Sequence, residues 1–167
     1  IQNRALRVAQ WAEGRGASFA LDESGGIRYW GYDRAGTSSL TPRLLSGLGK
    51  SVAVRACGSG NAAMVYSLRS DGSIWAIPGT SISERAQGFP VSGIDNAVAL
   101  SDGGDDACTG MLAIKKDGTV NQLAARGAAD PAAIPDSAVA VGIIGVLEAT
   151  QASCARDNCL VVNKAGE

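Results

Sequence analysis

The run MVYSLRSDGSIWAI, residues 64–77, carries the clearest structural signal in this chain. Apolar side chains occupy every second position before the Asp71-Gly72 pair, and a second apolar run, IWAI, follows it. Alternation with a period of two is typical of a β-strand, and Asp-Gly is a preferred residue pair in tight hairpin turns. The run therefore predicts two antiparallel strands joined by a short turn.

The same pattern extends upstream and recurs along the chain. A first alternating stretch, SVAVRAC at residues 51–57, is separated from the hairpin by a glycine-rich gap. Comparable sets of stretch, gap and hairpin surround four turns, at residues 24–27, 70–73, 116–119 and 164–167. Aligning Gly26, Gly72, Gly118 and Gly166 gives a period of about 46 residues, which is typical of repeat architectures. No repeat carries a 3.6-residue stripe, so helical repeats are disfavoured.

The repeats predict a single all-β domain, residues 1–167, built of β-meander blades. We expect blades at approximately residues 7–50, 51–95, 96–136 and 137–167, the last one stopping at its hairpin turn. In that fourth repeat, residues 138–144 are expected to form the first strand and residues 145–158 the gap. Residues 33–49, 79–95 and 124–136 are expected to hold the outer strand and return loop of each blade. Residues 1–6 fit either a short helical lead or an extra strand.

Composition argues against several classes of partner. Hydrophobic residues make up 46% of the chain and aromatics 5%, with 22 glycines and a net charge of −1. Basic residues form no cluster longer than Lys115-Lys116, so the sequence predicts no nucleic-acid binding. The longest apolar run, residues 138–147, is far shorter than the roughly 20 residues that span a bilayer, and no membrane span is expected in this chain.

The four cysteines lie at positions that suit two disulfides. Cys154 and Cys159 enclose a short segment between two expected strands, whereas Cys57 and Cys108 fall in the gaps of neighbouring repeats. We predict the pairs Cys57–Cys108 and Cys154–Cys159, and hence a secreted or cell-surface protein. Free buried thiols are the alternative. A zinc site is disfavoured, because the chain has no CxxC pair and no histidine.

These residues resemble the RCC1-like repeat family. Residues 51–58 match the valine-rich strand and gap of its repeat, and residues 66–76 match its small-apolar strand, Asp-Gly turn and third strand. Residues 18–31, which end in Trp30-Gly31, are the other good match. The resemblance implies β-propeller blades, usually seven in a ring. Tectonin-type repeats also place an aliphatic residue and Trp after an Asp-Gly turn, but their period is shorter.

The family's activities are not carried over by the resemblance. They include nucleotide exchange on small GTPases and protein inhibition of β-lactamases, whereas the matching residues here are scaffold positions. The third strands of repeats two and three also lack the family's Trp-Gly ending, since Ala76-Ile77 and Gln122-Leu123 stand in its place.

Catalytic groups are scarce in the sequence. Without histidine, neither a Ser-His-Asp triad nor a Cys-His pair is possible. The closest feature to a metal site is the acidic gap with Asp102, Asp105 and Asp106, whose oxygen ligands suit calcium but match no complete ligand loop. A solvated acidic turn is the simpler interpretation. We therefore expect no enzyme activity, no cofactor and no resident metal, and an enzyme using Asp105 or Asp106 with a metal is the minor alternative.

Side chains near strand ends and in the gaps are the candidates for binding a partner. We name six such residues: Trp11, Arg15, Tyr32, Asn61, Asp105 and Asp106. Exposed aromatics at such positions anchor protein partners. Phe19 and Tyr66 lie in the middle of expected strands and are predicted to pack between blades, and Trp30 and Trp75 are expected to occupy equivalent positions.

The sequence thus predicts a non-enzymatic, extracytoplasmic protein-binding or adhesion module whose partner is a protein or a cell-surface ligand. Rigid blades carry gaps that differ in length and sequence, and this variation lies where a ligand can be recognised. Two alternatives stay open. One is a structural subunit of a larger extracellular assembly, its last blade completed by a neighbouring chain or a longer parent chain, and the other is a secreted protein inhibitor of an enzyme.

Overall fold

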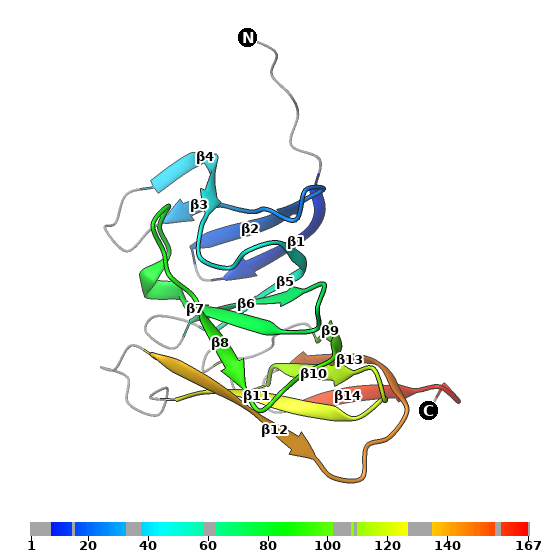
Figure 1. Cartoon of the computed structure of the whole chain (residues 1–167). Coiled ribbons are helices and arrows are strands. Elements are labelled where there is room, and N and C mark those ends of the chain that lie inside the picture. Colours follow the sequence, from blue (N-terminus) through cyan, green and yellow to red (C-terminus); the bar gives the residue numbers. More distant parts are fainter. Residues whose placement is uncertain are drawn as a thin grey trace.

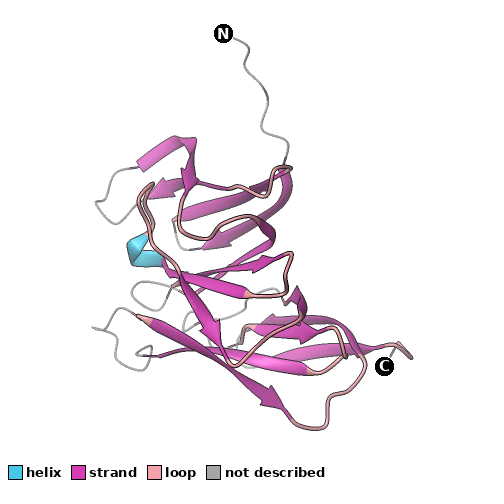
Figure 2. Cartoon of the chain, viewed as in Figure 1, coloured by secondary structure: helices cyan, strands magenta, loops and turns pink. Residues whose placement is uncertain are grey.

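The computed structural model describes residues 8–14, 16–32, 38–58, 63–101, 108, 110–126, 135–155 and 158–166, and in these ranges the chain is all-β apart from a single 3₁₀ turn (Figures 1 and 2). The elements in chain order are β1 (Val8–Gly14), β2 (Ala17–Asp22), β3 (Ile27–Tyr32), β4 (Ser38–Leu45), β5 (Ser51–Cys57), β6 (Met64–Arg69), β7 (Ile74–Pro78), η2 (Gly79–Ser81), β8 (Phe89–Ser92), β9 (Ala97–Leu100), β10 (Leu112–Lys115), β11 (Val120–Arg126), β12 (Ser137–Ile143), β13 (Ala149–Ala155) and β14 (Asn158–Asn163). The expected lead at residues 1–6 lies outside the described residues.

The strands form consecutive antiparallel meanders. The first blade is β1-β2-β3-β4, the second is β5-β6-β7-β8, the third is β9-β10-β11-β12, and β13 and β14 form a separate pair. The second and third blades share one sheet, because β8 and β12 pair in parallel at Val91 and Ala138. The blades follow one another from the N-terminal to the C-terminal end of the molecule (Figure 1).

The expected start of the fourth blade is wrong. Strand β12 pairs with β11 over its whole length, from Ser137 opposite Arg126 to Ile143 opposite Val120, so it is the outer strand of the third blade. The first strand of the last pair is β13, which lies within the expected 145–158 gap and occupies half of it. Alternating apolar residues show that 138–143 is a strand, but they do not show which neighbour it pairs with.

The alignment of the first turn also needs correction. Gly25, Gly72, Gly118 and Gly166 have φ between 81° and 84°, the left-handed region that favours glycine. The amide of each of these glycines donates to the carbonyl of the last residue of the second strand, Asp22, Arg69, Lys115 or Asn163. Gly25, not Gly26, is therefore the equivalent of Gly72.

Each of the first three turns also holds the blade that follows it. The amide of Ser51 donates to the carbonyl of Gly25 at 2.9 Å, that of Ala97 to Gly72 at 3.0 Å, and that of Ala149 to Gly118 at 2.9 Å. In every case the donor is the first residue of the next blade's first strand. The hairpin turn is thus a joint between blades as well as a reversal of the chain.

The core lies between blades. On the second strand of each blade, two side chains point forward, toward the next blade in chain order. Phe19 and Leu21 pack with the second blade, Tyr66 and Leu68 with the third, and Leu112 and Ile114 with β13 and β14. All six are at most 4% exposed. The predicted inter-blade packing of Phe19 and Tyr66 is confirmed.

Carboxylates cap the turns and make stability sensitive to acid. Asp71 Oδ1 accepts the Ser73 hydroxyl at 2.6 Å and the Ser73 amide at 2.9 Å, and Asp117 accepts the same pair of bonds from Thr119. These bonds, led by the one from the hydroxyl, hold the pKa of each carboxyl below its ordinary value. In the first turn the hydroxyl of Ser24 lowers the pKa of Asp22 in the same way.

We expect stability to fall in acid because of these three carboxylates. A lowered folded-state pKa stabilises the fold above the unfolded pKa of about 4, and that contribution is lost as the pH falls through the lower folded value. The urea midpoint should therefore drop between about pH 4 and pH 2. Combining Asp22→Asn, Asp71→Asn and Asp117→Asn keeps an acceptor oxygen but removes the titration, so the drop should be smaller. An equal drop in the triple variant would contradict this assignment.

Candidate protein-binding rim

The two ends of the blades differ in how their strands are connected. At one end, the second and third strands are joined by connections of constant length, residues 23–26, 70–73 and 116–119. At the other end, the first and second strands are joined by residues 15–16, 58–63, 101–111 and 156–157. We call this second end the rim. The strands that support the rim keep one antiparallel order while the lengths of its connections vary, as expected for a recognition surface on a rigid scaffold.

Four of the six predicted partner-binding residues belong to rim connections. Arg15, Asn61, Asp105 and Asp106 fall within residues 15–16, 58–63 and 101–111, but they lie outside the described residues. Their common location follows from the topology alone. The calcium prediction, with Asp102 beside the same two aspartates, also lies outside the described residues.

The two aromatic candidates occupy different places on their strands. Tyr32 is the last residue of β3, where it pairs with Ser38, and this strand end belongs to the rim. The sequence predicts Trp11 near a strand end, but Trp11 lies in the middle of β1, opposite Ala20. Tyr32 thus lies at the rim end of its strand, whereas Trp11 does not.

The two later tryptophans are not equivalent, contrary to expectation. Trp30 pairs with Ser18, whereas Trp75 pairs with Ser67. When the turn glycines are aligned, Ser67 corresponds to Ala20 and not to Ser18, so the two tryptophans occupy different positions on their strands. The guanidinium of Arg69 lies 3.9 Å from the centre of the Trp75 ring. This stacking makes Trp75 part of the scaffold.

Both predicted cysteine pairs lie at disulfide distance, and both belong to the rim. Cys57 ends β5 and meets Cys108 of the 101–111 connection, with their Cα atoms 5.0 Å apart. Cys154 faces Cys159 across the β13–β14 hairpin, with their Cα atoms 4.1 Å apart. The first pair links two blades, and the second closes the hairpin of the last pair of strands.

The two disulfides lie on opposite sides of the longest rim connection, residues 101–111. Cys108 ties this connection to the second blade. On the other side, Cys154 Sγ lies 3.7 Å from the Ser101 hydroxyl, and Cys159 Sγ lies 3.5 Å from the Gly110 carbonyl oxygen. The connection is therefore attached covalently to the second blade through Cys108, and residues at its two ends contact the Cys154–Cys159 pair. Sequence reasoning missed this arrangement, because spacing between cysteines does not show which loop lies between two disulfides.

Among the described residues, no three His, Cys, Asp or Glu side chains form a group that could hold a metal ion. Burial raises the pKa of the Tyr66 hydroxyl, which lies in the core between the second and third blades, away from solvent. No helix in the described part of the chain is long and apolar enough to span a membrane.

Comparison with known proteins identifies the fold. No protein-family model matches the chain, and no curated protein matches it by sequence. Among solved structures, human WBSCR16 matches with a TM-score of 0.69 and 16% identity, over 100% of this chain and 48% of that one.

Two structures of the yeast protein Prp20 agree with this result. Yeast RCC1 (Prp20) bound to Kap60 matches with a TM-score of 0.66 and 14% identity, over 97% of this chain and 43% of that one. Prp20p from Saccharomyces cerevisiae, in a study of its binding to Gsp1p and histones, matches with a TM-score of 0.65 and 15% identity, over 97% and 44%. The chain thus spans less than half the length of each of these proteins, and the likeness at these identities concerns the fold.

Proposed function

We propose that this chain, whose fold is that of RCC1-like β-propeller proteins, is a non-enzymatic module that binds a protein partner through its rim. The observation that carries the proposal is the contrast between the two ends of the blades. The connections between second and third strands have one length and repeated capping bonds, whereas those between first and second strands vary in length, and both disulfides lie at the rim end of the blades. Connections that vary in length and sequence on a rigid set of strands are typical of surfaces that recognise a specific partner.

The solved neighbours support a binding role by analogy. The Prp20 structures are described by what that protein binds, namely Kap60, Gsp1p and histones. The present chain shares their fold at 14% to 15% identity, so its own partner is set by its own rim residues. We assign the first contacts to Arg15, Tyr32, Asn61, Asp105 and Asp106.

The cysteine pairs support an extracytoplasmic setting, as a secreted or cell-surface protein in adhesion or partner capture. Disulfides persist in oxidising compartments and are rare in the reducing cytosol. Here all four cysteines are paired at disulfide distance, and one pair attaches the 101–111 connection to the second blade. A crosslinked rim keeps its shape before the partner arrives, which reduces the entropy lost on binding.

Comparison of rim and turn-end variants tests the binding role. The immobilised chain is used to capture proteins of the cell envelope and culture medium of its source organism, and the main captured protein is then purified. Combining Arg15→Ala, Asn61→Ala, Asp105→Ala and Asp106→Ala should raise its Kd at least about tenfold, because rim contacts are lost. The control combines Glu23→Ala, Lys50→Ala, Ser70→Ala and Lys116→Ala at the turn end, and its Kd should be unchanged. Loss of binding in the turn-end variant alone, or in neither variant, would contradict the proposal.

A further inference from the structure

The two disulfides differ in their exposure to solvent. Cys57 and Cys108 are 6% and 3% exposed and belong to the core between the second and third blades. Cys154 is also buried, at 6%, but its partner Cys159 is exposed. A thiolate in solution can therefore reach the second pair at Cys159, whereas the first pair has to open locally before it is attacked.

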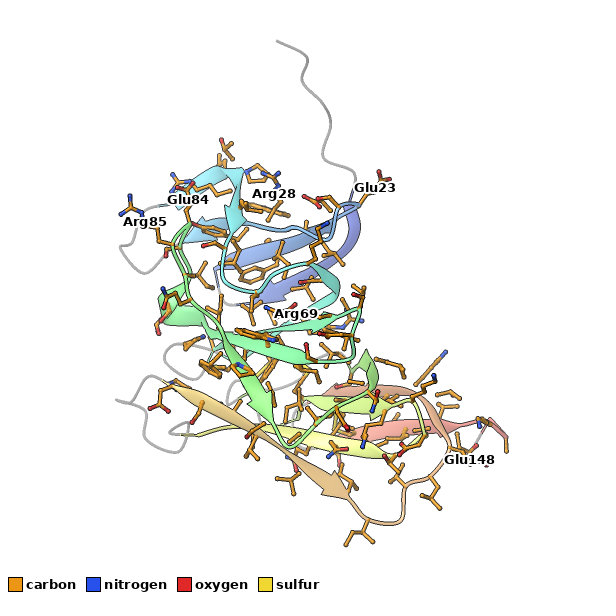
Figure 3. All side chains as sticks on the ribbon, in the orientation of Figure 1. Glu23, Arg28, Arg69, Glu84, Arg85 and Glu148 are labelled. Carbon is orange, nitrogen blue, oxygen red and sulfur yellow. A yellow bond between two sulfur atoms is a disulfide. The ribbon has the colours of Figure 1, made fainter. Side chains whose placement is uncertain are left out.

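Both sulfurs of the second pair face the third blade. Strand β13 lies beside β10, and the labelled Glu148 marks the end of β13 farthest from the rim, opposite to the cysteine pair (Figures 1 and 3). Cys154 packs with Leu112 and Ile114 of β10, and Cys159 lies directly opposite Cys154 across the hairpin. Because directly opposite residues of an antiparallel pair project to the same side, described residues of the third blade set the surroundings of both sulfurs.

These surroundings give an exchange reaction a direction. Cys154 Sγ lies 3.7 Å from the hydroxyl oxygen of Ser101, which accepts the Leu112 amide at 2.8 Å. The hydroxyl proton is therefore available to a sulfur and would stabilise a thiolate at Cys154. Cys159 Sγ lies 3.5 Å from the Gly110 carbonyl oxygen, an acceptor that would not stabilise a thiolate there. Cys159 is thus the sulfur to be attacked, and Cys154 is the better leaving group.

We propose that the Cys154–Cys159 disulfide is a redox switch of the rim, opened by a dithiol that attacks Cys159. The dithiol is a small molecule or a protein with two neighbouring thiols. Its first thiolate forms a bond to Cys159 Sγ while the Cys154–Cys159 bond breaks, and the electron pair of that bond passes to Cys154. Its second thiolate then attacks the sulfur of the dithiol in this mixed disulfide and releases Cys159. The dithiol is oxidised to a disulfide, and its two protons pass to Cys154 and Cys159.

Opening the pair removes contacts from both ends of the 101–111 connection. In the disulfide, one sulfur contacts Ser101 and the other contacts Gly110. Two thiols cannot approach each other as closely as two bonded sulfurs, so at least one of them leaves its contact. The connection then keeps its covalent attachment through Cys108 but is less preorganised. The effect of this change on partner binding rests on the proposed function, whereas the exchange chemistry does not.

Reduction of the full-length protein with dithiothreitol tests the switch. Timed alkylation and peptide mapping should show Cys154 and Cys159 modified at least about tenfold faster than Cys57 and Cys108, because the buried pair requires local opening. Hydrogen exchange of the amides of residues 101–111 should become faster on reduction and return on reoxidation. Reduction of both pairs at the same rate, or of Cys57–Cys108 first, overturns the proposal. So does hydrogen exchange that is the same in the oxidised and reduced proteins.

A change at Ser101 tests the direction of the exchange. Ser101→Ala should slow reduction of the second pair about tenfold, because the thiolate of Cys154 loses a hydrogen bond. Ser101→Thr keeps a hydroxyl and should restore the rate. Ser67→Ala is the matched control, since it also removes a fully buried hydroxyl, between the first and second blades, and should react like the wild type. A rate that does not change in Ser101→Ala contradicts Cys154 as the leaving group.

Partner binding is measured separately. Combining Cys154→Ser with Cys159→Ser imitates the reduced pair and should raise the Kd of the captured partner about fivefold, because the rim is less preorganised. The wild type reduced at this pair should show the same rise. An unchanged Kd together with faster hydrogen exchange in residues 101–111 would contradict the proposed role of the rim in binding. Selective reduction in the mapping experiment would still establish the exchange chemistry.

Discussion

Replacing Cys57 and Cys108 by alanine is expected to lower the free energy of unfolding of the oxidised protein by about 4 kcal/mol. The disulfide closes a loop with a sequence separation of 51, and the unfolded chain gains more entropy when a long loop is opened. It also joins the second blade to the 101–111 connection, so its loss frees one side of the rim. Partner binding at the rim should weaken together with stability.

The second disulfide is the matched control for this prediction. Cys154→Ala with Cys159→Ala opens a loop with a sequence separation of only 5, so the expected loss is about 2 kcal/mol. Urea unfolding of both variants and of the wild type gives the two differences. Non-reducing peptide mapping establishes first that both pairs are oxidised. Four free thiols in alkylated protein, or equal losses in the two variants, would contradict the assignment.

The parts of the fold that could be predicted from the sequence are local. An Asp-Gly pair favours a tight turn wherever it occurs, and alternating apolar residues favour a strand. The hairpin of β6 and β7 around Asp71-Gly72, and that of β10 and β11 around Asp117-Gly118, lie where the sequence predicts them. Both signals lie within a few residues, so no knowledge of the neighbouring blades is needed.

The parts that could not be predicted depend on contacts between distant segments. The alternating pattern of residues 138–143 fits a strand of the third blade and a strand of the fourth equally well. Only their pairing with β11 and their parallel contact with β8 place them in the third blade. Gly25 and Gly26 are equally able to reverse the chain. The left-handed residue is Gly25, whose carbonyl accepts the amide of Ser51 from the next blade.

For the candidate site, too, local features could be predicted from the sequence and contacts between distant segments could not. The variable gaps are visible in the sequence, and four of the candidate residues, such as Asn61, lie in them. That Cys108 and the Cys154–Cys159 pair hold one connection from two sides depends on how blades pack against each other. The exposure of Leu160 depends on it too, because its sequence pattern is that of the buried Leu112.

Gly72→Ala is expected to destabilise the protein by about 2–5 kcal/mol, because two penalties coincide at this joint. A residue with a Cβ is strained at φ +81°, by roughly 1–2 kcal/mol. The same Cβ would lie 2.7 Å from the Cα of Asn96, so the third blade would have to move away and the bond from the Ala97 amide would lengthen. Gly166→Ala is the control, because it has the same strain at φ +84° but no described atom lies within 4 Å of its Cβ. It should cost only about 1–2 kcal/mol. Urea unfolding of both variants measures the difference. Equal losses would mean that the hairpin turn reverses the chain without holding the next blade.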